Sequence, residues 1–440
     1  MGIIVAILTA VILGIIILEK PYIGLLVLIV GEYIRIGSLF PDFGEIHFQA
    51  LIIGVTTLRF IHGLFFSKDI TIPYYPQNKA QIGFFCVMGI NVIFAFFRMS
   101  AFKVFYGHIG ILFLFFMIIS LLNTREKLRK FVFFFILANA FLALLGLYNY
   151  FIEGKDIDNL STGGFVGGQD DYAVVISAAI PFTFFLYQQQ KLNKSKIFYA
   201  LLTVLLVAAV ILAFSRGGWV TLIGISALII FFSTHKIRTA VLMLIVVIIV
   251  LNILPPEFAD EFNTISTETG TATQRFELWR GAFRMFLDHP IIGVGMMNFP
   301  GVYGRFYMPE NPTTFHWITV HSIYFQLIAE MGLLGVIFFI SIVYWIIKDN
   351  LIIQKKLKSV DQIYSFPYAI SQGLTISILG YLLGSAFLSM LYYPPLYIIA
   401  ALTVALRNIA EKEIFKEDSL KSNQLLTPAL ERQDISFFNV

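Results

Sequence analysis

Charged residues are scarce in this chain, and their scarcity excludes a soluble globular protein. Asp, Glu, Lys and Arg make up 13% of the 440 residues, hydrophobic residues make up 58%, and the mean hydropathy is +0.82. Soluble domains average about 25% charged residues, because their surfaces must be hydrated. The composition therefore predicts an all-α polytopic membrane protein.

Several features of metalloenzymes and nucleotide-binding enzymes are also missing. The single cysteine, Cys86, lies in an apolar run, which excludes a disulfide framework and a cysteine-rich metal site. No set of His, Cys and carboxylate residues has zinc-site spacing, and neither a P-loop nor a G-x-S-x-G motif occurs. We therefore predict no metal site and no cofactor. Residues 1–18 lack a basic start and an A-x-A site, so we expect a first span rather than a cleaved signal peptide.

Long apolar runs are abundant, and a membrane-spanning helix needs about 20 such residues. The runs predict about 12–13 transmembrane helices, of which the first two are the least clearly separate crossings. They lie near residues 2–18, 21–37, 48–66, 80–98, 102–122, 131–151, 172–187, 197–214, 218–233, 238–254, 320–347, 370–390 and 392–407.

Lys and Arg in the short loops predict the orientation, because such residues are enriched on the cytoplasmic side. Four basic clusters and the charged tail from Arg407 fall on one predicted side, which we assign to the cytoplasm. The clusters are Arg125, Lys127, Arg129 and Lys130; Lys191, Lys194 and Lys196; Lys236 and Arg238; and Lys348, Lys355, Lys356 and Lys358.

The orientation divides the chain into four predicted regions. They are a transmembrane region (1–254), an extracytoplasmic catalytic loop with an amphipathic helix (255–320), C-terminal transmembrane helices (321–410) and a cytoplasmic tail (411–440). The extracytoplasmic loop carries Arg275, Arg280, Arg284 and Arg305 against the positive-inside trend. Because topology does not explain these arginines, a binding role is favoured.

Two arginine-bearing segments could bind an anion. In Ser215-Arg216-Gly217-Gly218, Arg216 lies at a predicted membrane boundary, where it could contact lipid headgroups or bind an anionic ligand. Residues 273–289 predict an amphipathic helix that ends at Pro290, with Arg275 and Arg280 flanking an apolar stripe. This helix could be a headgroup-binding lid, or its arginines could hold a substrate phosphate. The predicted stripe contains Phe276, Trp279, Phe283, Phe286 and Leu287.

Candidate proton-transfer residues follow the loop. His316 and His321 precede a span that contains Tyr324 and Glu330, and the spacing of three predicts that His321 and Tyr324 share a helical face. An imidazole at this boundary could accept a proton from a hydroxyl group, or it could be a structural hydrogen-bonding group. Glu330 could polarise the site or satisfy a neighbouring helix.

A glycine-rich segment, residues 163–168, precedes Asp170 and Asp171 at the start of another span. Adjacent carboxylates could bind a metal ion, but without further ligands they are at least as consistent with a helix cap.

Three of these segments together resemble the O-antigen ligase and polymerase superfamily. They are SRGGW, QRFELWRGAFRMFLDHPIIGVGMMNF and HSIYFQLIAEMGLLG, and the similarity covers roughly residues 160–345. GGQDDYAVVISAAIPF and VHSIYFQ are most similar to O-glycosylation ligases associated with exosortase systems, although Asp170-Asp171 departs from an expected acidic-asparagine pair.

The resemblance implies a GT-C-like fold and a metal-independent, inverting glycosyltransferase in the bacterial cytoplasmic membrane. Its donor would be a polyprenyl diphosphate-linked glycan, and its acceptor a lipid or protein hydroxyl at the extracytoplasmic face. Membrane lipids would surround it, and no nucleic acid partner is expected. The matching motif positions assign catalytic roles to Arg216, Arg275 and His321. Arg280, Tyr324 and His316 are the predicted substrate-binding residues.

Other functions fit parts of the pattern. A polymerase of lipid-linked repeat units would share the motifs, and only its acceptor would differ. A lipid-linked glycan transporter or flippase is less consistent, since transporters commonly show inverted repeats and midplane charges, and no repeat is evident here. A structural subunit of an envelope complex would not need these arginines or His321.

Overall fold

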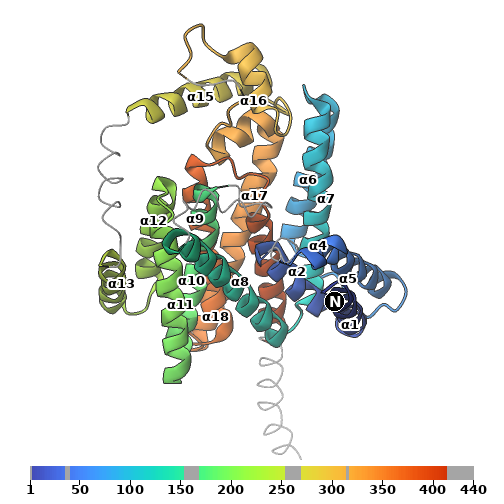
Figure 1. The fold of residues 1–440 in the computed structure, drawn as a ribbon, viewed down its shortest axis with the longest axis vertical. Helices are drawn as coiled ribbons and strands as arrows, with labels where there is room; N and C mark the ends of the chain where they lie inside the picture. Colours follow the sequence, from blue (N-terminus) through green and yellow to red (C-terminus); the bar gives the residue numbers. More distant parts are fainter. Residues whose placement is uncertain (1, 35–39, 153–167, 253–268, 314–316, 414–440) are drawn as a thin grey trace, which may run out of the picture.

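The computed structural model describes residues 2–34, 40–152, 168–252, 269–313 and 317–413. Within these ranges the chain is helical and contains no β-strand (Figure 1). The helices are α1 (Gly2–Glu19), α2 (Tyr22–Ile34), α4 (Pro41–Glu45), α5 (Phe48–Phe65), α6 (Pro76–Phe94), α7 (Arg98–Leu121), α8 (Arg125–Phe151), α9 (Gln169–Ser177), α10 (Ile180–Gln189), α11 (Asn193–Ile211), α12 (Arg216–Phe232), α13 (Lys236–Leu251), α15 (Thr269–Asp288), α16 (Phe299–Val302), the π-helical turn η2 (Tyr303–Tyr307), α17 (Ile323–Ser359), α18 (Phe366–Gly384), the 3-10 turn η3 (Ser385–Phe387) and a last helix over residues 394–413.

A helix lies at each predicted span position, which confirms the all-α polytopic class. By length and composition, eight helices in the described part of the chain could cross a membrane unaided. The predicted span over 172–187 is divided into α9 and α10, and Pro181 lies in the first turn of α10. Pro lacks a backbone N–H and is tolerated at that position.

Burial differs strongly between the helices. The last helix, α9, α10 and α18 are almost fully enclosed, and α10 and α12 both pack against α18. By contrast, α1 exposes most of its apolar side chains and packs chiefly against α5 at the periphery (Figure 1). Exposed apolar side chains of this kind suit contact with lipid. A helix also hydrogen bonds its own backbone polar groups, as a lipid environment requires.

A cap of short helices lies beyond one end of the bundle (Figure 1). This cap, residues 269–313, has its own apolar core, which includes Leu278, Ala282, Met285, Val302 and Tyr303. The predicted amphipathic helix is present as α15, and the chain leaves the helix just before Pro290.

Most of the apolar stripe predicted for α15 lies on the side that does not pack against the protein. Phe276, Phe283 and Leu287 are 66%, 49% and 60% exposed, whereas Leu278, Ala282 and Met285 face the protein. At 100° per residue these faces differ by roughly two-fifths of a turn. The small side chains at Gly281 and Ala282 allow close approach, because a Cβ on Gly281 would lie 2.7 Å from the Tyr303 ring. The large rings are left on the outside.

The segment that follows α15 is inserted into a break in α17. Gly332 has φ +59°, so the helical hydrogen bonds stop there. The N–H of Val294 bonds to the Ala329 carbonyl at 2.9 Å, and the N–H of Leu333 bonds to the Pro290 carbonyl at 2.7 Å. Each half of α17 is thus capped by the inserted backbone, which joins the cap firmly to the bundle.

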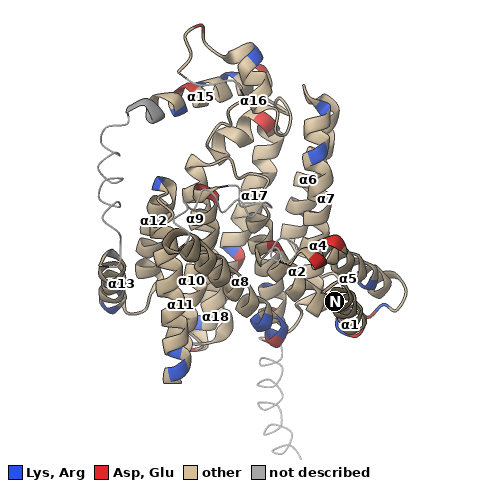
Figure 2. Ribbon diagram, viewed as in Figure 1, with Lys and Arg blue, Asp and Glu red and all other residues tan. Residues whose placement is uncertain are grey.

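Basic residues mark the opposite end of the bundle. Lys and Arg lie where α8, α11 and α13 begin, at the end away from the cap (Figure 2). The cap itself carries the arginines of α15, as the sequence predicts.

Candidate functional site

The described part of the chain contains a cavity of about 860 Å³, lined by both polar and apolar residues, close to the junction of cap and bundle. We call it the His321 cavity. Its volume is in the range typical of ligand-binding sites. It is lined by Glu32, Lys103, Val104, Gly107, His108, Ile111, Gly168, Gln169, Asp170, Asp171, Met297, Thr319, His321, Leu388, Ser389, Tyr392, Tyr393 and Pro394.

His321 lies before α17 rather than in it, so the prediction that it shares a helical face with Tyr324 is wrong. Its φ is +49°, a left-handed conformation that is uncommon for non-glycine residues, and α17 begins only at Ile323. Its backbone N–H donates a hydrogen bond to Ser389 Oγ at 3.0 Å. The Tyr324 hydroxyl instead donates to the Leu382 carbonyl at 3.0 Å.

The His321 side chain is half-buried between opposite charges. Burial lowers its pKa below the ordinary value, the Arg275 guanidinium lowers it further, and the Asp170 carboxylate opposes them. Burial disfavours the charged imidazolium because it removes hydrating water, Arg275 repels it, and Asp170 attracts it. The imidazole is therefore predominantly neutral at pH 7 and able to accept a proton.

Arg275 is on the side of α15 that faces the bundle, and its guanidinium lies 5.7 Å from the centroid of the Phe387 ring. Trp279 holds the same helix by stacking on Phe325 at 5.1 Å and by donating a hydrogen bond to the Val320 carbonyl. Arg280, five residues after Arg275, is exposed on the opposite side of α15. His316, like residues 163–167 of the glycine-rich segment, lies outside the described residues.

Arg216 is tied to the cavity through its neighbour Ser215. The Ser215 hydroxyl accepts a hydrogen bond from the Gly218 N–H at 2.9 Å and thereby caps α12, whose first residue is Arg216. The same hydroxyl donates to the carboxylate of Asp170. One carboxylate in the cavity thus fixes the end of the helix on which Arg216 lies.

The two aspartates do not cap α9 with their side chains. The N-cap residue is Gly168, and Asp170 and Asp171 lie in the first helical turn, where a negative charge is favourable. Asp171 accepts a hydrogen bond from the Tyr393 hydroxyl at 2.9 Å. Both carboxylates therefore hold parts of the cavity wall together.

Glu330 is a structural acceptor beside the cavity. It is 1% exposed and accepts hydrogen bonds from the Phe299 N–H at 3.2 Å and from the Tyr392 hydroxyl at 2.9 Å. Because Phe299 belongs to the cap and Tyr392 lines the cavity, Glu330 joins the two. It does not line the His321 cavity itself.

Sequence reasoning missed several lining residues, among them Lys103, His108, Glu32 and Ser389. None belongs to a recognisable motif. For Lys103, His108 and Glu32 the available signal was an ionisable side chain within a predicted span, since such residues are costly in lipid and tend to be functional. Ser389 carries no such signal.

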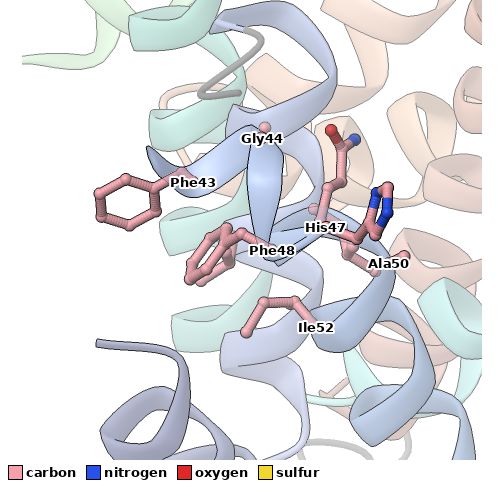
Figure 3. Close-up of a pocket in the computed structure, with 10 residues that line it drawn as sticks. Phe43, Gly44, His47, Phe48, Ala50 and Ile52 are labelled. Carbon is pink, nitrogen blue, oxygen red and sulfur yellow. The ribbon is translucent and has the colours of Figure 1, made fainter. Parts of the chain in front are cut away.

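Two neighbouring cavities lie toward the N-terminal helices. An apolar one of about 210 Å³ shares Glu32, Gly107, Ile111 and Pro394 with the His321 cavity. The next, of about 300 Å³, is formed by α2, α4 and α5 and shares Leu28 and Gln49 with the apolar one. Figure 3 shows the Phe43 and Phe48 rings on one side of it and His47 on the other. Among the described residues, no three His, Cys, Asp or Glu side chains are grouped as metal ligands.

Comparison with known families supports the resemblance seen in the motifs. Residues 201–340, about a third of the chain, match the family model described as O-antigen ligase. That range contains Arg216, Arg275 and His321. No curated protein matches the chain. The protein is thus a polytopic membrane protein whose segment 201–340 matches the O-antigen ligase family.

Proposed function

We propose that this protein is a glycosyltransferase that moves a glycan from a polyprenyl diphosphate carrier to a hydroxyl group of a lipid or protein acceptor. The observation that carries the proposal is the position of His321, half-buried in a large cavity between Arg275 and Asp170, within the family segment. We place the reaction at the extracytoplasmic face of a bacterial cytoplasmic membrane, with the cap outside.

The donor diphosphate would bind between the cap and the bundle. Arg275 on α15, Arg216 at the start of α12 and Lys103 on α7 supply positive charge around this region. A guanidinium group can donate two parallel hydrogen bonds to a phosphate and neutralise charge that develops on the leaving group. Arg280, on the exposed side of α15, would act at most on parts of the substrate outside the cavity.

The start of the polyprenyl chain would occupy the apolar cavity next to the His321 cavity. Gly107 and Gly110 leave the α7 backbone open, and Leu25, Ile29 and Leu114 supply apolar surface there. Because Glu32 and Gly107 line both cavities, a lipid whose diphosphate is near His321 could place its first isoprene units in the adjacent apolar space. A water-soluble donor would not need such a space.

The reaction follows from these positions. The acceptor oxygen attacks the anomeric carbon on the face opposite the diphosphate, while neutral His321 takes the hydroxyl proton. The bond between the anomeric carbon and the diphosphate oxygen breaks, and the arginines stabilise the departing diphosphate. Attack from the opposite face inverts the anomeric configuration. A positioned general base typically contributes about 10²–10⁴-fold to a rate.

The test is a transfer assay in nanodiscs with a polyprenyl diphosphate-linked glycan, candidate lipid and protein acceptors, and EDTA. We expect product from the native protein and none from His321→Ala, Arg275→Gln or Arg216→Gln. Arg284→Gln, which removes an exposed charge from the same helix, is the control and should remain active. Activity in all variants would refute the site, loss of activity with EDTA would refute metal independence, and self-extension of the donor glycan would indicate a polymerase.

A further inference from the structure

A second polar cavity lies at the opposite end of the bundle from the cap. It has a volume of about 130 Å³ and is formed by α10, α11, the start of α13 and the segment before α18. Its lining residues are Tyr187, Gln188, Lys196, Thr234, His235, Arg238, Thr239, Leu242 and Tyr364. We call it the Arg238 cavity. It has no residue in common with the His321 cavity.

The lining is basic and contains no carboxylate. Lys196 and Arg238 come from different helices, and neither forms an ion pair with another described residue. Asp361 is the one acidic residue in the segments that connect α10 to α11, α12 to α13, and α17 to α18. It is exposed and does not line the cavity. Two cations that line one small space, without a carboxylate between them, favour the binding of an anion there.

Polar groups beside the cavity are held in place by a network of hydrogen bonds. Thr239 is 1% exposed, and its hydroxyl is hydrogen bonded to Ser233 Oγ at 2.6 Å. Ser233 Oγ also accepts hydrogen bonds from Gln188 Nε2 at 3.2 Å and from the His235 N–H at 3.3 Å. This network fixes the start of α13 against α10, so the cations project from a rigid frame.

Apolar surface continues from the cavity along α13. Arg238, Leu242, Ile245 and Ile249 follow one another at helical spacing, and Ile245 and Ile249 are 46% and 43% exposed. α13 lies at the edge of the bundle (Figure 1), and its start carries basic residues (Figure 2). A ligand with a phosphate group and hydrocarbon chains would match both the cavity and this face.

We propose that the Arg238 cavity binds the phosphate-bearing headgroup of an anionic phospholipid, whose acyl chains lie along α13. Basic pockets between transmembrane helices are suited to such headgroups. The cavity has no carboxylate to pair with the amine of a zwitterionic lipid, so net negative charge is preferred. The site is independent of the proposed transferase activity.

Native mass spectrometry of the full-length protein in mild detergent tests the proposal, with phosphatidylglycerol, phosphatidylcholine and inorganic phosphate as probes. We expect one tightly bound phosphatidylglycerol, weaker phosphatidylcholine and no displacement by phosphate. Lys196→Gln/Arg238→Gln should weaken the binding of phosphatidylglycerol at least about tenfold, because the double variant removes both cations from the cavity. The control is Lys194→Gln/Lys236→Gln, which removes the same charge from the same helices outside the cavity.

Equal weakening in both double variants would mean general attraction to a basic surface and would overturn the proposal. Displacement by inorganic phosphate would assign the cavity to a soluble anion instead. A second pair of variants keeps all charges: Leu242→Trp fills the cavity, whereas Leu244→Trp changes an exposed position outside it. We expect only Leu242→Trp to lose the bound lipid, and retention by both would also overturn the proposal.

Discussion

The backbone N–H of His321 and the side-chain hydroxyl of Ser389 are joined by a hydrogen bond of 3.0 Å, and both residues line the same cavity. The bond holds His321 in a left-handed conformation, which costs free energy for any residue with a Cβ. Ser389 follows η3, far along the chain from the cap, so the catalytic candidate is positioned from two sides.

Replacing Ser389 by alanine should therefore slow transfer without impairing donor binding. A hydrogen bond contributes about 0.5–1.5 kcal/mol net, so we expect kcat to fall about three- to tenfold. Steady-state kinetics with varied donor concentration should show an unchanged KM. Ser389→Thr, which keeps a hydroxyl, should restore most of the rate, and an unaltered kcat in Ser389→Ala would contradict the positioning role.

The dependence of transfer on pH should report the charges beside His321. Neutral imidazole is the active form, so activity is lost as the pH falls through the His321 pKa, which lies below its ordinary value. Asp170→Asn removes the charge that raises this pKa and should move the acidic limb to lower pH. Arg275→Gln should move the limb of any residual activity to higher pH, whereas Arg275→Lys should leave it nearly unchanged. A limb that does not move would exclude His321 as the titrating group.

Removal of Glu330 should destabilise the joint between cap and bundle. Glu330→Ala leaves the Phe299 N–H and the Tyr392 hydroxyl without their acceptor, at about 1–3 kcal/mol for each buried group. We expect a loss of roughly 2–5 kcal/mol in the free energy of unfolding, visible as a lower unfolding temperature in detergent. Glu310→Ala, an exposed carboxylate in the cap, is the control. Equal unfolding temperatures in the two variants would contradict this role.

Gly332 should tolerate no side chain. A Cβ there would lie 2.6 Å from the Ile291 carbonyl carbon and 2.7 Å from the Gly293 nitrogen, and φ is +59°. We expect Gly332→Ala to lower the yield of folded protein sharply, measured by fluorescence-detection size-exclusion chromatography. Gly14→Ala meets no atom within 4 Å and should express normally.

Filling the apolar cavity should affect long-chain donors selectively. Gly110 lines this cavity and has open space around it, so Gly110→Leu would occupy the proposed polyprenyl position. We expect the KM for a full-length polyprenyl donor to rise at least about tenfold, with little change for a short-chain analogue. Gly54→Leu on α5, which is equally open but lines no described cavity, should behave as native. Equal effects on both donors would place the lipid elsewhere.

The sequence was sufficient to predict where helices lie, because hydropathy along the chain is a local property, but it did not predict the division of the span 172–187 into α9 and α10 or the break in α17 at Gly332. Arg216, Arg275 and His321 were singled out from short segments, and the structure brings His321 close to Arg275 and connects Arg216 to the same cavity through Asp170. Their catalytic roles remain predictions.

Two features could not be derived from local sequence. The periodicity of α15 defines an aromatic stripe, but the face that packs is decided by whether Gly281 can approach Tyr303, which is a tertiary contact. Lys103 and Ser389 join the cavity only because α7 and the segment after η3 meet there. Neither residue lies near His321 in the sequence.

The break in α17 couples the cap mechanically to the long membrane-spanning half of that helix. Residues 290–295 are hydrogen bonded to the end of the first half, at Ala329 and Glu330, and to the start of the second half, at Leu333 and Leu334. A change in the tilt of the second half, of the kind that bilayer thickness imposes, therefore acts directly on the cap segment. The cap and the residues beside His321 should consequently move as one body when the membrane becomes thinner or thicker.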